Sequence, residues 1–355
     1  MERGVMRSRI EAIGAYLPDR EVTTAELMGR LAIDSPPDLE RITGVRTRRV
    51  RGTDADGRPE DSYSITLAAA RSALAASAYS ATDLDVVITC SITRTRGTKF
   101  QLEPSFALTV RNALGAHRAL HFDVANACAG MMTGILVLDR MIRSGAVRRG
   151  LVVSGECITP IADTAVAEIS EKYDLQFASL SVGDAGAAVV LDDSGVDGDC
   201  VDYIELNTSA AFAEACIGMP SDQRPDLALY TDNRALHTEG RYLLGVYQFQ
   251  DFLAARGSSF PAENYDYVVH HQFSAPAVEL IDKIAERELG APMPPGLAVL
   301  EKYGNTASTA HFVVLHDALR AGTIAPGSKV WMVPAASGVV TGFLSVTVGA
   351  TRVGA

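Results

Sequence analysis

One stretch, residues 121–143, limits the possible folds of this chain more than any other. It begins as a short apolar run, breaks at the small residues 126–130, and continues with apolar residues at helical spacing. The pattern predicts a strand, a tight turn and a helix, with Cys128 at the helix N-terminus, where the dipole and unpaired N–H groups stabilise a thiolate. This is the geometry of a nucleophile elbow with cysteine in the usual place of serine. The alternative is a buried core cysteine.

The same pattern returns 177 residues later in the chain. The matching pairs are Cys128 and Asn305, Gly145 and Gly322, and Gly150 and Gly327. In both copies a small-residue turn opens a helix, the helix ends at glycine, and a strand follows. We therefore expect two copies of one α/β unit, with Asn305 in the place of the cysteine; chance similarity of two such units is the alternative. The linker-like residues 192–199 place the boundary between residues 1–192 and residues 193–355.

Two such units packed about a pseudo-twofold axis would direct both helix N-termini at one shared site. A strand predicted at residues 265–271 ends in two histidines, at the end of a strand where open α/β sheets place ligand-binding groups. Adjacent strand residues face opposite sides, so only one histidine can enter the site. We assign His271 to the site and a structural role to His270. Residues 200–260 are expected to form an irregular insertion with one helix near residues 241–255.

Composition excludes several classes of protein. The formal charge of −11 over 355 residues argues against general nucleic-acid binding. No apolar run approaches the length of a membrane span, and no long apolar segment opens the chain. The cysteines form no CxxC or CxxH pattern, so neither a zinc site nor a disulfide framework is indicated. They are Cys90, Cys128, Cys157, Cys200 and Cys216. A cytoplasmic protein with reduced thiols is expected, with Cys90 and Cys157 in the core.

Three motifs in order resemble a known family. Cys128 in ANACAG, His271 in HHQ and Asn305 in YGNTAS resemble the Cys-His-Asn triad of thiolase-fold condensing enzymes, and the closest branch is β-ketoacyl-acyl-carrier-protein synthase III. Residues 41–46 are similar to its TGI-x-x-R motif, and residues 181–188 to its FGDGAGA strand. The resemblance covers nearly the whole chain. It implies an α/β thiolase fold with duplicated αβ halves in five αβαβα layers, the cysteine in the first half and the histidine and asparagine in the second.

The chain also departs from that family. Residues 335–342 replace its glycine-rich loop, from which one backbone donor of an oxyanion hole is expected; Ser337 and Gly338 are the candidates. Met131 and Met132, just after the cysteine, predict an acyl pocket lined by flexible, polarizable side chains.

Glu103, within Leu102-Glu103-Pro104, is a further departure. It resembles the LEP-type glutamate of the head-to-head acyl-condensing enzymes of the long-chain olefin pathway and of related resorcinol- and pyrone-forming synthases. In those relatives the glutamate reaches the partner subunit's active site. The alternative is a carboxylate at the N-terminus of the helix expected from Pro104.

The resemblance implies an acyltransferase of EC class 2.3.1, a ketosynthase. An acyl group on Cys128 would form a carbon–carbon bond by Claisen condensation with a second acyl or β-ketoacyl thioester, in polyketide or other natural-product biosynthesis or in fatty-acid-derived biosynthesis. His271 and Asn305 would donate to the enolate oxygen. Glu103 would remove the α-proton of a substrate without a carboxylate. A decarboxylating initiation synthase using a malonyl thioester, and an acyltransferase to a hydroxyl or amine, stay open; Cys128 argues against a non-catalytic subunit.

The resemblance also bears on substrates and assembly. The partners would be acyl-CoA or an acyl carrier protein, with coenzyme A or phosphopantetheine thioesters as substrates and neither a further cofactor nor a metal. A C2 homodimer would form through the strand before the elbow helix. Basic residues gather at 46–51 and at 94–99. Either group is a solvated loop or a patch for an anionic carrier or a nucleotide phosphate.

Overall fold

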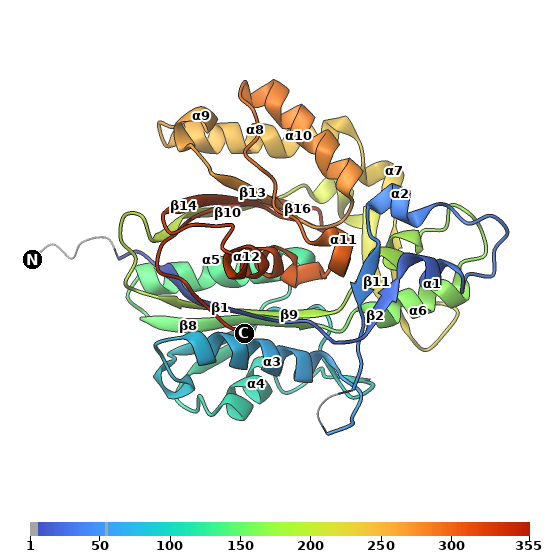
Figure 1. Ribbon diagram of the computed structural model, residues 1–355, viewed down its shortest axis with the longest axis horizontal. Helices are drawn as coiled ribbons and strands as arrows, with labels where there is room; N and C mark the ends of the chain where they lie inside the picture. Colours follow the sequence, from blue (N-terminus) through green and yellow to red (C-terminus); the bar gives the residue numbers. More distant parts are fainter. Residues whose placement is uncertain (1–5, 54–55) are drawn as a thin grey trace, which may run out of the picture.

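The protein is described here from a computed structural model covering residues 6–53 and 56–355; residues 1–5 and 54–55 of the expected first half lie outside the described residues. Five layers alternate as αβαβα (Figure 1). Helices α3 (Ser62–Ala76) and α4 (Phe106–Leu114) cover the outer face of the first sheet. Helices α5 (Gly130–Arg143) and α12 (Ala310–Arg320) lie between the two sheets, and α8 (Glu239–Ala255) and α10 (Ala275–Leu289) lie outside the second. The expected five-layer arrangement is present.

The first sheet has six strands in the order β17-β1-β9-β8-β4-β7. Its strands are β1 (Arg9–Tyr16), β4 (Val86–Thr89), β7 (Leu120–Asp123), β8 (Arg149–Glu156), β9 (Ala185–Asp192) and β17 (Arg352–Val353). β4 pairs in parallel with both β7 and β8, whereas β9 is antiparallel to β8 and β1. The central strands β4, β8 and β9 are buried along almost their whole length because helices cover both faces. β7 is the edge strand opposite β17.

The second sheet has the order β10-β16-β14-β13, and β15 pairs with β16. Its strands are β10 (Cys200–Thr208), β13 (Tyr267–His270), β14 (Ser328–Val333), β15 (Ala335–Ala336) and β16 (Val340–Val348). The irregular structure expected over residues 200–260 was wrong, whereas the helix expected near residues 241–255 is confirmed as α8. Residues 200–208 are a full strand of this sheet, and β11 (Cys216–Pro220) with β12 (Leu227–Thr231) forms a hairpin. A register shift between Val201 and Tyr203 breaks the alternation by which β10 would have been recognised.

The remaining elements are short connections around the cavity and the sheet edges. They are β2 (Glu21–Thr23), β3 (Thr47–Arg49), β5 (Thr95–Arg96), β6 (Lys99–Phe100), α1 (Thr24–Met28), α2 (Leu39–Thr43), α6 (Thr159–Glu168), α7 (Asn233–Leu236), α9 (Phe260–Glu263) and α11 (Leu300–Tyr303). Within the described ranges, no helix has the length and apolar character needed to cross a membrane.

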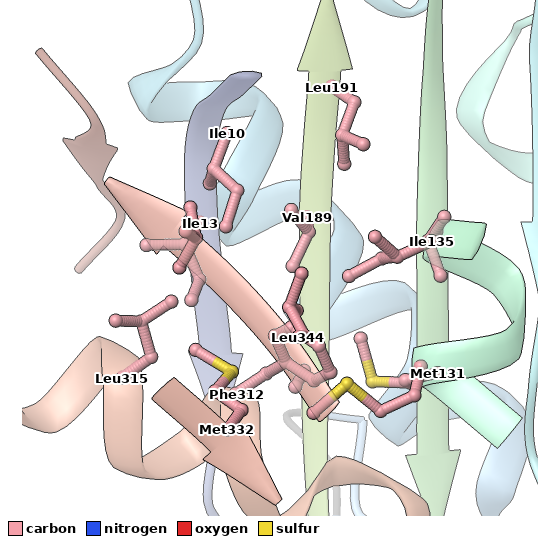
Figure 2. Packing of buried hydrophobic residues seen from close by; sticks show 14 of the residues in the cluster. Ile10, Ile13, Met131, Ile135, Val189, Leu191, Phe312, Leu315, Met332 and Leu344 are labelled. Atoms are coloured by element: carbon pink, nitrogen blue, oxygen red, sulfur yellow. The ribbon is translucent and has the colours of Figure 1, made fainter. Parts of the chain in front are cut away.

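The largest core cluster lies between the sheets, around α5 and α12. Figure 2 shows Met131 and Ile135 of α5 in the same cluster as Phe312 of α12 and Leu344 of β16. Met131 and Met132 are 0% and 1% exposed and belong to this cluster. The expectation that they line an acyl pocket was therefore wrong: the first turn of α5 directs them between the sheets, where each buried side chain contributes about 1.5–3 kcal/mol.

Along the chain, the expected boundary at residues 192 and 193 falls between β9 of the first sheet and β10 of the second. β9 ends the first half at Asp192, and β10 opens the second sheet at Cys200. The C-terminal β17 returns to pair with β1, so the last residues of the chain belong to the first sheet. The division into two domains stays a prediction.

Candidate active site

Cys128 lies on a strained turn between β7 and α5. It is the middle residue of a 3-10 turn over Ala127–Ala129, directly before α5. Ala127 has φ 45°, in the left-handed region that a residue other than glycine adopts at a cost of about 1–3 kcal/mol. Gly130 is needed because a Cβ there would lie 2.6 Å from the Cys90 carbonyl oxygen. A turn of this kind presents the side chain that follows the strained residue.

The surroundings of Cys128 oppose ionisation of its thiol. The side chain packs against a small apolar cluster that includes Ile158, Ile161 and Val182. Burial raises the pKa of the Cys128 thiol, Cys216 and Glu156 add to the rise, and the Cys128 backbone N–H opposes it. Loss of hydration thus acts against the thiolate expected at the helix N-terminus, and the thiolate stays a prediction.

The second copy of the elbow is centred on Ser308, which corrects the expected pairing of Cys128 with Asn305. A 3-10 turn over Ala307–Thr309 precedes α12, and Ala307 has φ 53°, as Ala127 has in the first copy. Helix α12 has 11 residues and α5 has 14, so the offset of 177 holds only at the helix C-terminal ends. Ser308 is 1% exposed and its hydroxyl bonds the Glu156 carboxylate and Ser154.

Asn305 is held just before that turn by the loop at residues 181–183. Its N–H donates to the Ser181 carbonyl at 2.9 Å, and its carbonyl accepts from the Gly183 N–H at 3.0 Å. A Cβ on Gly183 would lie 2.0 Å from the Tyr303 carbonyl oxygen, so only glycine fits. The side-chain Oδ1 of Asn305 accepts from the Ala307 N–H at 3.0 Å. The amide NH₂ is therefore the end that remains for the cavity.

His271 directly follows β13, and its N–H donates to the Val333 carbonyl at 3.0 Å. The ring stacks between His311, with centroids 5.7 Å apart, and Phe273, at 6.1 Å. Burial, with His311 as a lesser cause, lowers the pKa of His271 to about 3, so the ring is neutral near pH 7. Its Nδ1 is buried and has no hydrogen-bond partner within residues 6–53 and 56–355.

The neighbouring His270 is directed elsewhere. Its Nε2 lies 2.7 Å from the Asp282 carboxylate on α10. It lines a small side pocket, and it is not among the described residues that line the large cavity. The structure thus places His271 at the cavity and gives His270 a carboxylate partner, as the alternation along the strand predicted.

The side chains of both halves meet in one cavity of about 1220 Å³. Cys128, His271, Asn305 and Ser337 all line it. The volume exceeds the roughly 300–1,000 Å³ usual for a small-molecule site. Ser337 donates a hydrogen bond to the Cys216 sulfur at 3.0 Å, whereas Gly338 is not among the described residues of the lining. Cys90 and Cys157 are buried as expected.

Glu103 lies outside the cavity of its own chain. It is exposed, in the loop before α4. The alternative that it caps this helix was wrong: Ser105 is the N-cap, and the Asp123 carboxylate accepts from the N–H groups of Phe106 and Ala107, each at 2.8 Å. A tertiary neighbour from β7 thus supplies the anion that the helix N-terminus favours.

Sequence reasoning missed Arg241 and Cys216, which also line the cavity. Arg241 opens a helical run, where an ordinary amphipathic helix carries a surface charge, so no local signal marks it. Arg48 is 1% exposed and donates to the Leu180 carbonyl and Thr24, so the basic residues at 46–51 do not form one continuous patch. In the part of the chain that is described, no cluster of three His, Cys, Asp or Glu side chains could hold a metal ion.

Comparisons with known proteins agree with this arrangement. The family description "3-Oxoacyl-[acyl-carrier-protein (ACP)] synthase III" matches residues 122–210, and its C-terminal counterpart matches residues 256–348. The β-ketoacyl-[acyl-carrier-protein] synthase III of Alkalilimnicola ehrlichii is 30% identical over 90% of this chain and 93% of its own length. That of Bradyrhizobium sp. is 29% identical over 92% and 94%.

Solved structures share the fold. A cysteine-to-serine variant of Xanthomonas campestris OleA with bound lauric acid and lauroyl-CoA superposes with a TM-score of 0.81 at 22% identity, covering 97% of this chain and 100% of that one. The 3-oxoacyl-[acyl-carrier-protein] synthase III of Aquifex aeolicus gives a TM-score of 0.75 at 22% identity, covering 96% and 99%. The chain therefore has the thiolase fold common to these enzymes.

Proposed function

The chain belongs to the β-ketoacyl-[acyl-carrier-protein] synthase III family of acyltransferases, and from this we propose a Claisen condensation between an acyl group on Cys128 and a second acyl or β-ketoacyl thioester. One observation carries the proposal. The thiol on the strained elbow, the neutral ring of His271 and the amide of Asn305 line one cavity, although they come from opposite halves of the chain. We assign the reaction to polyketide or fatty-acid-derived biosynthesis.

The first half-reaction loads the enzyme. The Cys128 sulfur attacks the thioester carbonyl, the new carbon–sulfur bond forms, and the bond to the carrier thiol breaks. The Cys128 proton passes to the departing carrier sulfur, so an acyl-enzyme and a free carrier thiol result. Because burial raises the pKa of the thiol, we propose that proton transfer accompanies the attack. Backbone N–H groups of Cys128 and of the loop at Ser337 and Gly338 are the proposed donors to the tetrahedral intermediate.

The second half-reaction needs a carbanion at the α-carbon of the incoming thioester. Its oxygen gains charge, and His271 and Asn305 donate to it. The buried Nδ1 of His271 lacks a partner in the described chain. An unpaired buried lone pair costs less than an unpaired N–H, so we place the ring proton on Nε2. The carbanion attacks the acyl carbon, and the Cys128 sulfur leaves with the bonding electrons.

The proposal has two versions, which differ in how the carbanion is formed. Without a carboxylate on the second substrate a base must remove a proton, and Glu103 of the partner subunit is our candidate. Its exposure on a loop beside the edge strand β7 supports action across a dimer interface. Glu103 does not line the cavity of its own chain as described. This equally favours the second version, in which a malonyl thioester loses carbon dioxide and no base is required.

Substrates follow from the cavity and from the relatives. A cavity of about 1220 Å³ accommodates an acyl chain together with the arm of its carrier. The OleA structure holds lauroyl-CoA. We therefore propose acyl-CoA or acyl-carrier-protein thioesters as substrates. Transfer to a hydroxyl or amine is the competing reaction, and the presence of both His271 and Asn305 favours carbon–carbon bond formation.

The test begins with acyl loading. After incubation with lauroyl-CoA, intact-mass spectrometry should show one lauroyl group on the wild type and none on Cys128→Ala. Cys216→Ala is the matched control, because this second cysteine lines the same cavity, and it should load normally. Persistent acylation of Cys128→Ala would refute the nucleophile. Product analysis with and without an added alcohol then separates a ketone-type product from an ester.

A further inference from the structure

Arg241 is a buried cation in the cavity wall, and it has no carboxylate partner in the part of the chain that the structure describes. It lies in the first turn of α8 and is 8% exposed. Its Nε donates to the Leu236 carbonyl, and its guanidinium carbon lies 4.7 Å from the centroid of the Tyr242 ring. Burial lowers the pKa of Arg241, an interaction with the Tyr242 side chain opposes part of that fall, and no carboxylate among residues 6–53 and 56–355 pairs with Arg241. A buried charge costs desolvation free energy unless an opposite charge pairs with it. An anion from outside the chain could supply that pairing for Arg241.

The position of Arg241 indicates which part of a substrate it meets. Arg241 and His271 line the large cavity together, and they also line an adjoining pocket of about 70 Å³. Most residues that line this small pocket are apolar, and Arg241 and His271 are among its few polar ones. Lys172 and Arg234 also line the large cavity but are exposed. Exposed cations of this kind suit a carrier outside the cavity, whereas the buried Arg241 shares an inner pocket with His271.

The chemistry of the site fits a carboxylate. A guanidinium binds a carboxylate through two parallel N–H···O bonds, shorter and stronger than neutral hydrogen bonds. His237 lines the same cavity, and its Nδ1 is 2.6 Å from the Tyr242 hydroxyl. When the Tyr242 hydroxyl donates to Nδ1, the ring proton of His237 lies on Nε2. His237 Nε2 is then a second hydrogen-bond donor, beside Arg241, for a carboxylate.

We infer that Arg241 recognises a carboxylate at the far end of an acyl thioester, so that the enzyme accepts a dicarboxylic acid monothioester and retains that carboxylate in the product. The inference rests on the proposed condensation. A carboxylate that leaves as carbon dioxide loses its charge in the transition state. A guanidinium on it would stabilise the ground state more than the transition state and slow the reaction. The pairing therefore suits a carboxylate that takes no part in bond making.

The experiment compares succinyl-CoA with butyryl-CoA, which have four-carbon acyl chains and differ in the terminal carboxylate. Cys128 loading is followed by intact mass, and turnover by release of coenzyme A. The wild type should favour succinyl-CoA. Arg241→Met should raise the KM for succinyl-CoA about 10²-fold and leave that for butyryl-CoA within a few-fold, since loss of one partner of a buried charge pair has effects of this size. Arg241→Lys should recover part of the loss.

The control is Arg256→Met, which removes an exposed arginine following the same helix and should leave both substrates unchanged. Equal effects of Arg241→Met on succinyl-CoA and butyryl-CoA would overturn the inference. So would an effect on malonyl-CoA alone, since the bound carboxylate would then be the leaving one. If Arg241→Met does not fold, a wild type with no preference for succinyl-CoA overturns it. Absence of any acyl loading in the wild type would instead refute the proposed function.

Discussion

At the scale of single residues, the candidate site depends on which atom of each side chain is already engaged. The Oδ1 of Asn305 is held by the Ala307 N–H, and the Nδ1 of His271 is buried. Each side chain therefore offers one nitrogen donor to the cavity. Neither is needed to bring an acyl group to Cys128, but both would be needed when charge develops on the second thioester.

We therefore expect His271→Ala and Asn305→Ala to load an acyl group and then stall. Loss of one such donor lowers the rate of condensation by about 10²–10³, because the enolate oxygen loses a preorganised hydrogen bond. Intact mass measures the first step and product formation the second. His270→Ala should condense normally. A dead His270→Ala variant beside a fully active His271→Ala variant would show that the other histidine belongs to the site.

The buried histidines also predict a dependence of stability on pH. The pKa of His311 is lowered from about 6.5 to about 4, chiefly by burial. Below pH 6.5 the unfolded chain therefore binds a proton that the folded chain does not. His311 thus destabilises the fold increasingly as the pH falls from 6.5 to about 4, by about 1.4 kcal/mol per pH unit. Above pH 6.5 this effect is absent.

His311→Phe keeps a ring and removes the titration. Between pH 7 and pH 4, the free energy of unfolding measured with urea should fall in the wild type by a few kcal/mol more than in this variant. The comparison with wild type is required because other groups act in the opposite sense: burial raises the pKa of Asp184 to about 6, so the folded state gains relative stability as that carboxyl protonates. A difference between wild type and variant that stays constant with pH would contradict the prediction.

At the scale of elements, the loop at residues 181–184 holds the site in place, and its residues Ser181 and Val182 also line the cavity. Its backbone bonds both the N–H and the carbonyl of Asn305, and Asp184 accepts from the N–H groups of Ile158 and Thr159 at the start of α6. Ile158 in turn lies in the apolar cluster around Cys128. The motif that resembles the family's FGDGAGA strand thus connects the two halves of the site.

Gly183→Ala should separate the two half-reactions. Its Cβ would overlap the Tyr303 carbonyl and push Asn305 out of place, so condensation should fall at least tenfold while Cys128 still loads. Gly296→Ala is the matched control, because a Cβ there meets nothing within 4 Å. Wild-type condensation by a folded Gly183→Ala variant would show that the close approach does not position Asn305.

At the scale of the whole molecule, the edge of the first sheet is the place where a second copy would add. β7 ends the strand order, and Leu120 on it is 58% exposed. Phe100 and Leu102, near Glu103 in the chain, are 45% and 75% exposed. An unpaired edge beside exposed apolar side chains is a template for strand addition. We propose a C2 homodimer through β7, which would bring Glu103 toward the partner's cavity.

Mixed dimers test this arrangement. Glu103→Gln should load acyl groups but fail to condense two plain acyl thioesters, and a malonyl thioester should restore turnover in part. Mixing Glu103→Gln with Cys128→Ala should recover some activity, because one hybrid site then holds both native groups. Light scattering should give twice the 37.7 kDa chain mass. A monomer at micromolar concentration, or a Glu103→Gln variant that condenses plain thioesters at the wild-type rate, would contradict the proposal.

Local patterns in the chain were sufficient to predict the class of fold and much of the candidate site. The apolar periodicity of residues 121–143 identified the elbow, because the spacing of buried side chains reports strand and helix directly. The strand expected at residues 265–271 is β13, which ends one residue earlier, and the internal repeat pointed to the turn near Asn305 but placed it three residues too early. The five-layer arrangement came from the family resemblance and is present in the structure.

Only the tertiary structure decided what surrounds those side chains. Burial, which raises the pKa of Cys128, depends on segments far away in the chain. The shorter α12 made Ser308 the counterpart of Cys128, and the inter-sheet core took Met131. Arg241 stands 113 residues after Cys128 and lines its cavity only because the two sheets pack around the same pair of helices. Desolvation and approach between distant segments leave no periodic trace in the sequence, so neither can be read from spacing alone.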